Sequence, residues 1–356
     1  MSIYIDPDAV SRLRQYEMPG KLGFGRVIAP VMFRAVCQDG CWSRGELVPY
    51  TALSLDPAAK VLHYGQSCFE GLKAYRTPDD EVALFRPEKN AARMAYSAKR
   101  LCMSPVPESL FLDGVRTVAL YCANLVPANS GESLYLRPFL MGTQADLTVS
   151  ASASYMFYVI ASPSEAYHAG NMRLWVERDD TRAAVGGTGD AKVGGNYAAS
   201  LLSTGRLRER GYDQSLWLNP ANRSSVDELS GMNFFAVMGE VLYTPALNGS
   251  ILEGVTRASL IELARDRGYQ VVEGEIHINE LLKQVASGVC SEAFACGTAA
   301  IVSSISVIGD AGGSYRLSKA PGPVAQSLRQ ALLDIQEGRA EDRYGWMQLL
   351  GAITNI

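Results

Sequence analysis

The sequence predicts an α+β protein with mixed or antiparallel sheets, divided into two domains. The chain has 356 residues, of which 47% are hydrophobic, and this is enough for a large core at roughly 100–200 residues per domain. Short β-branched and aromatic runs occur beside stretches with helical periodicity, so strands and helices are both expected. A strict alternation of strands and helices is missing, which argues against a Rossmann domain.

The expected elements follow from local periodicity and residue type. Ala91, Met94 and Ala98 recur at helical spacing, and Ser154 begins an apolar run typical of a buried strand. Helices are predicted at residues 87–101, 110–125, 197–209, 257–267 and 324–336. Strands are predicted at residues 154–161, 173–177, 214–219, 234–238 and 300–308.

A segment punctuated by Ser, Pro and Gly, residues 162–171, is expected to link the two domains. The N-terminal domain would then span residues 1–161 and the C-terminal domain residues 172–356. Thr256 immediately precedes one predicted helix and is expected to be its N-cap.

Composition and charge argue against several classes of protein. The net charge is −4 with no block of like charge, so neither nucleic-acid binding nor a membrane surface is indicated. No run approaches the roughly 20 apolar residues of a membrane span, and no signal peptide is recognisable; a soluble, cytoplasmic protein is expected. The seven cysteines are scattered and the three histidines isolated, which predicts reduced thiols and no metal site.

The strongest chemical signal is Lys192, which stands in the glycine-dense segment that runs from Gly186 to Tyr197. Glycines permit close backbone approach, and a lysine held there is suited to attack carbonyl groups. A surface lysine in a glycine turn is the alternative. The segment lacks the Gly-Lys-Ser/Thr of a phosphate-binding P-loop, and Lys192 stands where the last glycine of a dinucleotide fingerprint belongs.

Two further segments complete a possible cofactor site. Glu228 follows Asp227 before a small-residue turn, although two solvated carboxylates at the start of a strand would look the same. The helix that follows Gly254 offers N–H groups and a positive dipole end, which suit a phosphate. Pyridoxal phosphate requires a lysine, an acid opposite its ring nitrogen and an anion cradle, and the chain has a candidate for each.

At these segments the chain resembles the branched-chain amino-acid aminotransferases, which are fold-type IV pyridoxal-phosphate enzymes. The resemblance extends from about Gly23 to Gly351, with its motifs in the family's order. It rests on Leu62-His63-Tyr64-Gly65-Gln66, Phe69-Glu70-Gly71-Leu72-Lys73-Ala74-Tyr75, Leu84-Phe85-Arg86-Pro87, Tyr135-Leu136-Arg137-Pro138, the Lys192 segment, Glu228 to Asn233, Leu252 to Arg257 and Gly297-Thr298-Ala299. It implies a smaller N-terminal α/β domain and a larger C-terminal pseudo-barrel domain that binds pyridoxal 5'-phosphate.

The resemblance also implies roles for single residues. Lys192 would be the catalytic lysine that binds the cofactor covalently, and Glu228 would pair with its ring nitrogen. The other cofactor-binding positions are Tyr197 at the ring oxygen, Leu252 on the ring face, and Arg86, Val255, Thr256 and Thr298 around the phosphate. The substrate-binding positions are Tyr64, Phe69, Tyr135, Arg137, Val149, Tyr167, Thr298 and Ala299.

The implied reaction transfers an amino group from a branched-chain L-amino acid (Leu, Ile or Val) to 2-oxoglutarate, which gives the branched-chain 2-oxo acid and L-glutamate. The implied assembly is a homodimer with its active site near the subunit interface. Tyr135 and Arg137 are expected to bind the distal carboxylate of glutamate.

Two departures from the family keep other substrates open. Asp180 stands two residues before Arg182, where relatives carry an aromatic residue, and a buried carboxylate would disfavour an aliphatic substrate. Asp180 facing solvent is the plainer interpretation. Cys68 is smaller than expected. The alternatives are an aminotransferase for an unusual or more polar amino acid in a specialised pathway, a D-amino-acid aminotransferase and an aminodeoxychorismate lyase; a non-enzymatic scaffold would not need Lys192 and Glu228.

Overall fold

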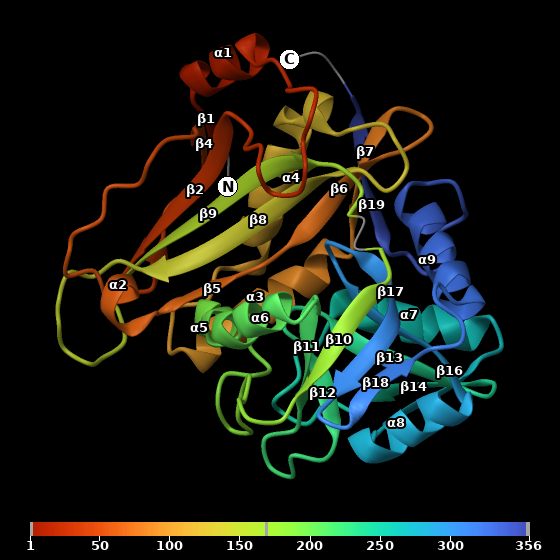
Figure 1. Cartoon of the computed structure of the whole chain (residues 1–356). Coiled ribbons are helices and arrows are strands. Elements are labelled where there is room, and N and C mark those ends of the chain that lie inside the picture. Colours follow the sequence, from red (N-terminus) through yellow and green to blue (C-terminus); the bar gives the residue numbers. More distant parts are fainter. Residues whose placement is uncertain (1–2, 168–169, 354–356) are drawn as a thin grey trace. The chain divides into compact units, whose positions relative to one another are not determined.

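The computed structural model describes residues 3–167 and 170–353. The chain divides into two compact units that interleave along the sequence. The first unit comprises Met1–Tyr167, Ala191–Gly194 and Asp334–Ile356, and the second comprises His168–Asp190 and Gly195–Leu333. Figure 1 labels their elements along the chain.

The first unit contains a ten-stranded sheet with helices. Its elements are β1 (Tyr4–Ile5), α1 (Pro7–Gln15), β2 (Val31–Gln38), β3 (Cys41–Trp42), β4 (Glu46–Pro49), α2 (Lys60–Tyr64), β5 (Ser67–Phe69), β6 (Leu72–Arg76), β7 (Glu81–Phe85), α3 (Pro87–Arg100), α4 (Glu108–Tyr121), the 3₁₀ turn η1 (Ala123–Leu125), β8 (Ser133–Gly142), β9 (Ser154–Ser164) and β19 (Met347–Ala352). The main strand order is β1-β4-β2-β9-β8-β6-β7-β19, and its pairs are antiparallel except β1–β4.

Helix α4 packs on strands β2, β8 and β9, and α3 packs on α4 and β5. Their apolar faces join one core, represented by Phe33, Met94, Phe111 and Phe157. Helix α3 begins with Pro87, whose fixed φ suits a first turn. Successive side chains of a strand point to opposite faces, so a smaller cluster around Tyr158 forms separately from the main core.

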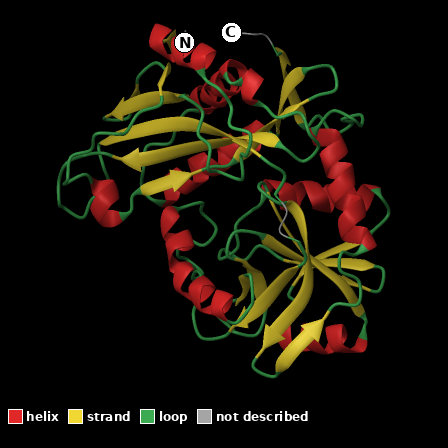
Figure 2. Cartoon of the chain, turned by 45° about the horizontal axis from the view of Figure 1, so that its top comes forward, coloured by secondary structure: helices red, strands yellow, loops and turns green. Residues whose placement is uncertain are grey.

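The second unit is built on a nine-stranded sheet that closes on itself. Its elements are β10 (Met172–Glu177), α5 (Gly194–Ala199, which begins in the first unit), α6 (Leu201–Glu209), β11 (Gln214–Leu218), β12 (Val226–Leu229), β13 (Asn233–Met238), β14 (Val241–Pro245), α7 (Val255–Asp266), β15 (Gln270–Gly274), α8 (Ile278–Ser287), β16 (Cys290–Gly297), β17 (Ile301–Asp310), β18 (Gly313–Arg316) and α9 (Pro323–Gln336, which ends in the first unit). The order is β12-β11-β10-β17-β16-β13-β14-β15, and an additional β12–β13 pairing joins the ring. The yellow strands of Figure 2 show this barrel-like arrangement.

The α+β class expected from the sequence is confirmed. Three local expectations are wrong. The helix placed at 110–125 is α4 followed by η1, and the helix placed at 197–209 is interrupted at Ser200 between α5 and α6. The N-cap of α7 is Gly254 in an extended conformation, so Thr256 lies inside the first turn.

The predicted domain limits at 161 and 172 remain a prediction. Strand β9 continues to Ser164 and β10 begins at Met172, and residues 168 and 169 of the predicted linker lie outside the described residues. All seven cysteines are free thiols.

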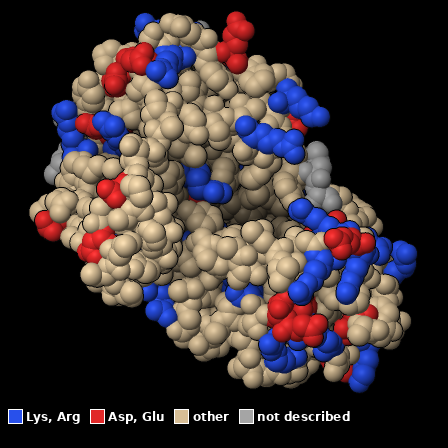
Figure 3. Space-filling view, turned by 60° about the vertical axis from the view of Figure 1, so that its left-hand side comes forward, with Lys and Arg blue, Asp and Glu red and all other residues tan. Residues whose placement is uncertain are grey.

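In the part of the chain that the structure describes, no helix has the length and apolar character of a membrane span. Within the same residues, no group of His, Cys, Asp and Glu is arranged to hold a metal ion. Lysine, arginine and acidic side chains are interspersed over the face drawn in Figure 3. The cytoplasmic location remains a prediction.

Candidate active site

Lys192 lies in a short segment that belongs to the first unit, although its neighbours along the chain belong to the second. Its N–H donates to the Ser97 hydroxyl at 2.9 Å, and its carbonyl accepts from the N–H of Phe69 at 3.0 Å. Val193 forms a β-bridge with Cys68. Helix α3 and strand β5 therefore hold the backbone of this lysine.

The side chain of Lys192 is half-buried. Its Nζ lies 4.9 Å from the centre of the Phe69 ring, a distance at which the face of an aromatic ring attracts an ammonium group. The alternative of a fully solvated lysine in a glycine turn therefore does not describe Lys192.

Glu70, next to Phe69 in the chain, is fully buried and pairs with the largely buried Arg93. Arg93 donates to its two carboxylate oxygens at 2.7 and 2.8 Å, and the Asn90 amide donates at 2.8 Å. Burial by itself would raise the pKa of Glu70, but the charge and hydrogen bonds of Arg93, with contributions from Lys192 and Asn90, lower it below its usual value. Glu70 is therefore a fixed negative charge in the unit that carries Lys192.

Arg137 and Tyr135, on strand β8, gather with Phe69. Arg137 donates to the Tyr135 hydroxyl at 2.9 Å, and its guanidinium lies 4.7 Å from the Phe69 ring centre. Among the described residues, the buried Nε of Arg137 has no hydrogen-bond partner. Phe24 contacts Tyr135 and Tyr167 edge-on, with ring centres 5.0 and 5.9 Å apart. Three predicted aromatic substrate positions, Phe69, Tyr135 and Tyr167, thus join Phe24 in one cluster with Arg137.

The structure shows why position 71 of this motif is a glycine. A Cβ at Gly71 would lie 2.2 Å from the hydroxyl oxygen of Tyr135, so any side chain there would displace the ring. The absence of a side chain at Gly71 therefore leaves the space that the Tyr135 hydroxyl occupies.

Val149, a further predicted substrate position, lies in the loop between β8 and β9, and Tyr64, another such position, is the last residue of α2. Tyr64 donates from its hydroxyl to the carbonyl of Leu147. The residues Leu147 and Val149 are 63% and 88% exposed. Val149 therefore presents its side chain to solvent on the surface of the first unit, unlike the aromatic cluster.

Arg86, the predicted phosphate ligand, is the N-cap of α3 and has the left-handed φ of 47°, which is uncommon outside glycine. Its N–H donates to the carbonyl of Trp346 at 2.8 Å, and its guanidinium lies 5.0 Å from a ring centre of that tryptophan. Trp346 stacks on Tyr344 with ring centres 4.1 Å apart. The C-terminal segment thus fixes the direction of Arg86.

In the second unit, Glu228 is buried within strand β12 rather than solvated at the start of a strand. Arg182 approaches its Oε1 at 2.7 Å, and the N–H of Leu252 donates to the same oxygen at 3.1 Å. The Asn233 amide donates to Oε2 at 2.9 Å. These contacts stabilise the charged form of Glu228 and fix its orientation.

Asn233 connects this carboxylate to the start of α7. Its amide also donates to the Leu252 carbonyl at 2.9 Å, and a Cβ at Gly254 would lie 2.1 Å from its Oδ1. The N-cap of α7 is Gly254, which has no side chain with which to cap the first turn, where Val255 and Thr256 lie. The N–H groups of this turn are of the kind that bind phosphate at a helix N-terminus.

Two turns lie side by side near Tyr197. A Cβ at Gly231 would lie 3.8 Å from a ring carbon of Tyr197, and a Cβ at Gly297 would lie 3.5 Å from the Gly231 carbonyl. Thr298 and Ala299 follow in the turn between β16 and β17. The predicted positions of the second unit are thus distributed over α5, β12, the start of α7 with the segment before it, and the turn after β16.

Sequence patterns did not reveal Arg182, Arg93 or Phe24 as site residues. Each of these contacts a residue that is distant in the sequence, and no local motif marks it. Asn233 closes the motif that begins at Glu228, but the motif alone did not show that its amide binds that carboxylate. Asp180, by contrast, is half-exposed and pairs with Arg206 at 3.3 Å. The carboxylate that suggested a polar substrate therefore has a solvent-side partner.

Comparisons with known proteins agree with this arrangement. The family described as amino-transferase class IV matches residues 67–308. The "probable branched-chain-amino-acid aminotransferase" of Streptomyces coelicolor is 47% identical over 334 residues, which cover 92% of each chain. The branched-chain-amino-acid aminotransferase of Mycolicibacterium smegmatis is 44% identical over 88% of this chain and 87% of the relative.

Solved structures of branched-chain amino acid aminotransferases also resemble this chain. The branched-chain amino acid aminotransferase of Escherichia coli superposes with a TM-score of 0.74 at 28% identity, over 89% of this chain and 99% of that chain. A second branched-chain amino acid aminotransferase, solved with pyridoxamine 5'-phosphate, gives a TM-score of 0.73 at 29% identity, over 93% and 99%. This chain belongs to the class IV aminotransferase family.

Proposed function

We propose that this protein transfers an amino group, with pyridoxal 5'-phosphate, between branched-chain L-amino acids and 2-oxoglutarate. The observation that carries the proposal is Lys192, whose backbone is held by Ser97 and Phe69 beside a buried anion. The names of the similar proteins support the substrate class.

The residues present fit that cofactor. Glu228 is a fixed carboxylate for a protonated ring nitrogen. The N–H groups of Val255 and Thr256 are donors of the kind that a phosphate binds, and Arg86 is a further proposed phosphate ligand. Leu252 offers an apolar contact, and Tyr197 and Thr298 offer hydroxyl groups. When bound, the cofactor draws electrons from the α-carbon of the amino acid.

Lys192 transfers the α-proton of the amino acid substrate. Its Nζ is the base that removes the α-proton of the amino acid and the acid that returns it, which is general acid–base catalysis by one group. Glu228 contributes by remaining negative, because a charged partner at the ring nitrogen favours the state that accepts electrons.

Arg137 explains how one site takes two kinds of substrate. Aromatic rings of Phe69 and Tyr135 surround its guanidinium, so an aliphatic side chain finds apolar surface there. The distal carboxylate of glutamate or 2-oxoglutarate finds a guanidinium with an unused buried donor, Nε, among the described residues. Thr298 and Ala299, in the turn after β16, are the remaining proposed substrate-binding positions.

The assembly proposed is a homodimer whose active site lies near the subunit interface. The exposed apolar side chains of Leu147 and Val149 support it, since grouped apolar side chains on a surface are typical of an interface. A species of twice the 38.5 kDa chain mass in sedimentation analysis is the expected result, and a monomer that is fully active would contradict it.

The proposed activity is tested by steady-state turnover with 2-oxoglutarate and a panel of L-leucine, L-isoleucine, L-valine, L-lysine and D-leucine, with glutamate formation as the readout. We expect kcat/KM for the branched L-amino acids to exceed that for lysine and D-leucine by about 100-fold or more, because a charged or misoriented side chain leaves buried groups unpaired. Preference for L-lysine would favour a specialised polar substrate, and preference for D-leucine would favour the D-specific branch.

A further inference from the structure

Lys60 is an ammonium-bearing side chain with no exposed surface, at the start of helix α2 in the first unit. Its Nζ donates to the backbone carbonyls of Thr148 and Ser150 at 3.1 and 3.0 Å, and also to the Ser150 hydroxyl. The carboxylate of Asp146 lies 3.6 Å away. A buried charge is tolerated where it is paired and hydrogen-bonded, and every one of these acceptors belongs to one loop.

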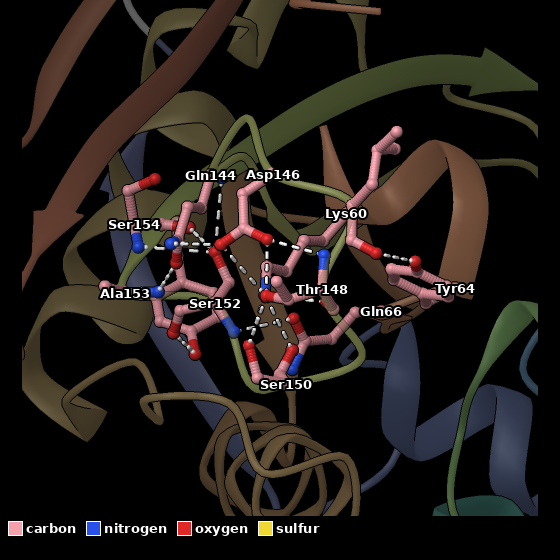
Figure 4. Close-up of polar contacts among 12 residues, drawn as sticks. Lys60, Tyr64, Gln66, Gln144, Asp146, Thr148, Ser150, Ser152, Ala153 and Ser154 are labelled. Carbon is pink, nitrogen blue, oxygen red and sulfur yellow. Dashed lines mark hydrogen bonds and ion pairs between the residues drawn. The ribbon is translucent and has the colours of Figure 1, made fainter. Parts of the chain in front are cut away.

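That loop, residues 146–150 between β8 and β9, surrounds Nζ, as Figure 4 shows. Asp146 also accepts from the N–H and the hydroxyl of Thr148; these bonds and the charge of Lys60 lower the pKa of Asp146. The Gln144 amide donates to Asp146 at 2.9 Å. The polar atoms of the loop thus point inward.

The apolar side chains of the same loop point outward. Leu147 and Val149 alternate with Asp146, Thr148 and Ser150 along the chain, and they are 63% and 88% exposed. Tyr64 provides a second attachment through the Leu147 carbonyl. An exposed loop without regular hydrogen-bonded structure would otherwise sample many conformations.

We propose that Lys60 is a positioning residue that fixes the loop at residues 146–150 and so places Val149 for substrate binding. The inference rests on the proposed function, together with the substrate-binding position that the family resemblance implies for Val149. Without the ammonium, the carbonyls of Thr148 and Ser150 turn to water and the loop populates several conformations. Only the fraction of molecules with the correct loop then binds substrate at full strength, so the apparent affinity falls by that fraction.

The test uses the full-length holoenzyme with Lys60→Met, which retains the length and apolar stem of the side chain but removes the charge and donors. Hydrogen exchange of the backbone amides at 146–152 is expected to accelerate at least about tenfold. If the correctly ordered fraction falls to about a tenth, KM for leucine rises about tenfold while kcat changes less than about twofold. Lys99→Met, which removes an exposed lysine of the same unit, is the matched control and should change neither.

Ser150→Ala and Asp146→Asn guard against a variant that fails to fold. Each removes one partner of Lys60 and should give a smaller change in the same direction in both measurements. Normal exchange and normal KM in Lys60→Met, or in both partner variants if Lys60→Met does not fold, would overturn the inference. Wild-type enzyme without activity on leucine would instead refute the proposed function; normal loop exchange in the variants would then still refute the positioning role.

Discussion

The two units each contain a buried carboxylate paired with arginine, but the two pairs are built differently. In the first unit, Arg93 donates to both oxygens of Glu70. In the second, Arg182 approaches one oxygen of Glu228, while the other accepts from Asn233. Glu70 meets a guanidinium at both oxygens and the Asn90 amide at one of them. Glu228 meets a guanidinium at one oxygen and neutral donors at both.

This difference indicates that the Glu70–Arg93 pair supports the fold, whereas the Glu228–Arg182 pair supports the proposed chemistry. A bidentate buried pair is specific in geometry, and Glu70 uses it to connect the Phe69 segment with helix α3, both of which hold Lys192. Glu228 is connected through Asn233 to the start of α7. A change at that carboxylate therefore alters the proposed cofactor site directly.

The largest expected effect is that of Glu228→Gln, which we predict lowers kcat about 100- to 1,000-fold, in the range seen when one preorganised electrostatic group is removed. Asp227→Asn is the matched control, because Asp227 is equally buried and next in the chain but is bonded to Asn248 and Ser250. We expect it to cost stability and leave kcat within about threefold. Equal kcat losses in the two variants would remove the distinction between them.

The next effect is on stability. Glu70→Gln leaves the largely buried Arg93 guanidinium without its counter-charge, and breaking such a pair costs about 3–5 kcal/mol. We expect a reduction of that order in the free energy of unfolding, measured by urea denaturation at pH 7. Glu88→Gln, an exposed position on α3, should change it by less than about 0.5 kcal/mol.

The Glu70–Arg93 pair also predicts the direction in which the free energy of unfolding changes with pH. Because the folded-state pKa of Glu70 is lowered, its contribution is fully present above the ordinary glutamate pKa of about 4.3 and is lost as the pH falls through the lower folded value. The difference in stability between wild type and Glu70→Gln should therefore shrink on acidification below about pH 4. A difference that grows there would show that the charge of Glu70 is not what stabilises the unit.

The smallest effect concerns substrate choice and is confined to the first unit. Arg137→Met removes the cation but keeps apolar bulk, so KM for 2-oxoglutarate should rise at least about tenfold, since a hydrogen bond to a charged group is worth about 1.5–3 kcal/mol. KM for leucine should change less than about threefold. Equal increases for both substrates would show that Arg137 shapes the pocket rather than binds a carboxylate.

Residues in local motifs were accessible from the sequence, and residues that act through distant partners were not. Lys192 and Glu228 stand in short segments of small residues, so both could be recognised as unusual from the sequence alone. Arg182 and Asn233 acquire meaning only when the barrel brings β12, β13 and the start of α7 together.

Errors at helix boundaries have a similar cause. Thr256 has the side chain of an N-cap, but Gly254 takes that position, where a Cβ would meet the Asn233 side chain. The helix predicted through Ser200 is broken although the residues on both sides favour helix. Local propensity thus indicated the elements, and tertiary contacts decided where they begin and end.

The central claim is that Lys192 binds pyridoxal 5'-phosphate and acts on branched-chain amino acids. The most direct test is the visible absorbance spectrum of purified protein with the cofactor, before and after leucine, for wild type and Lys192→Ala. We predict a wild-type band that shifts on adding leucine and a variant in which the band is absent or unresponsive. No band in the wild type, or an equal response to leucine in Lys192→Ala, would contradict the account.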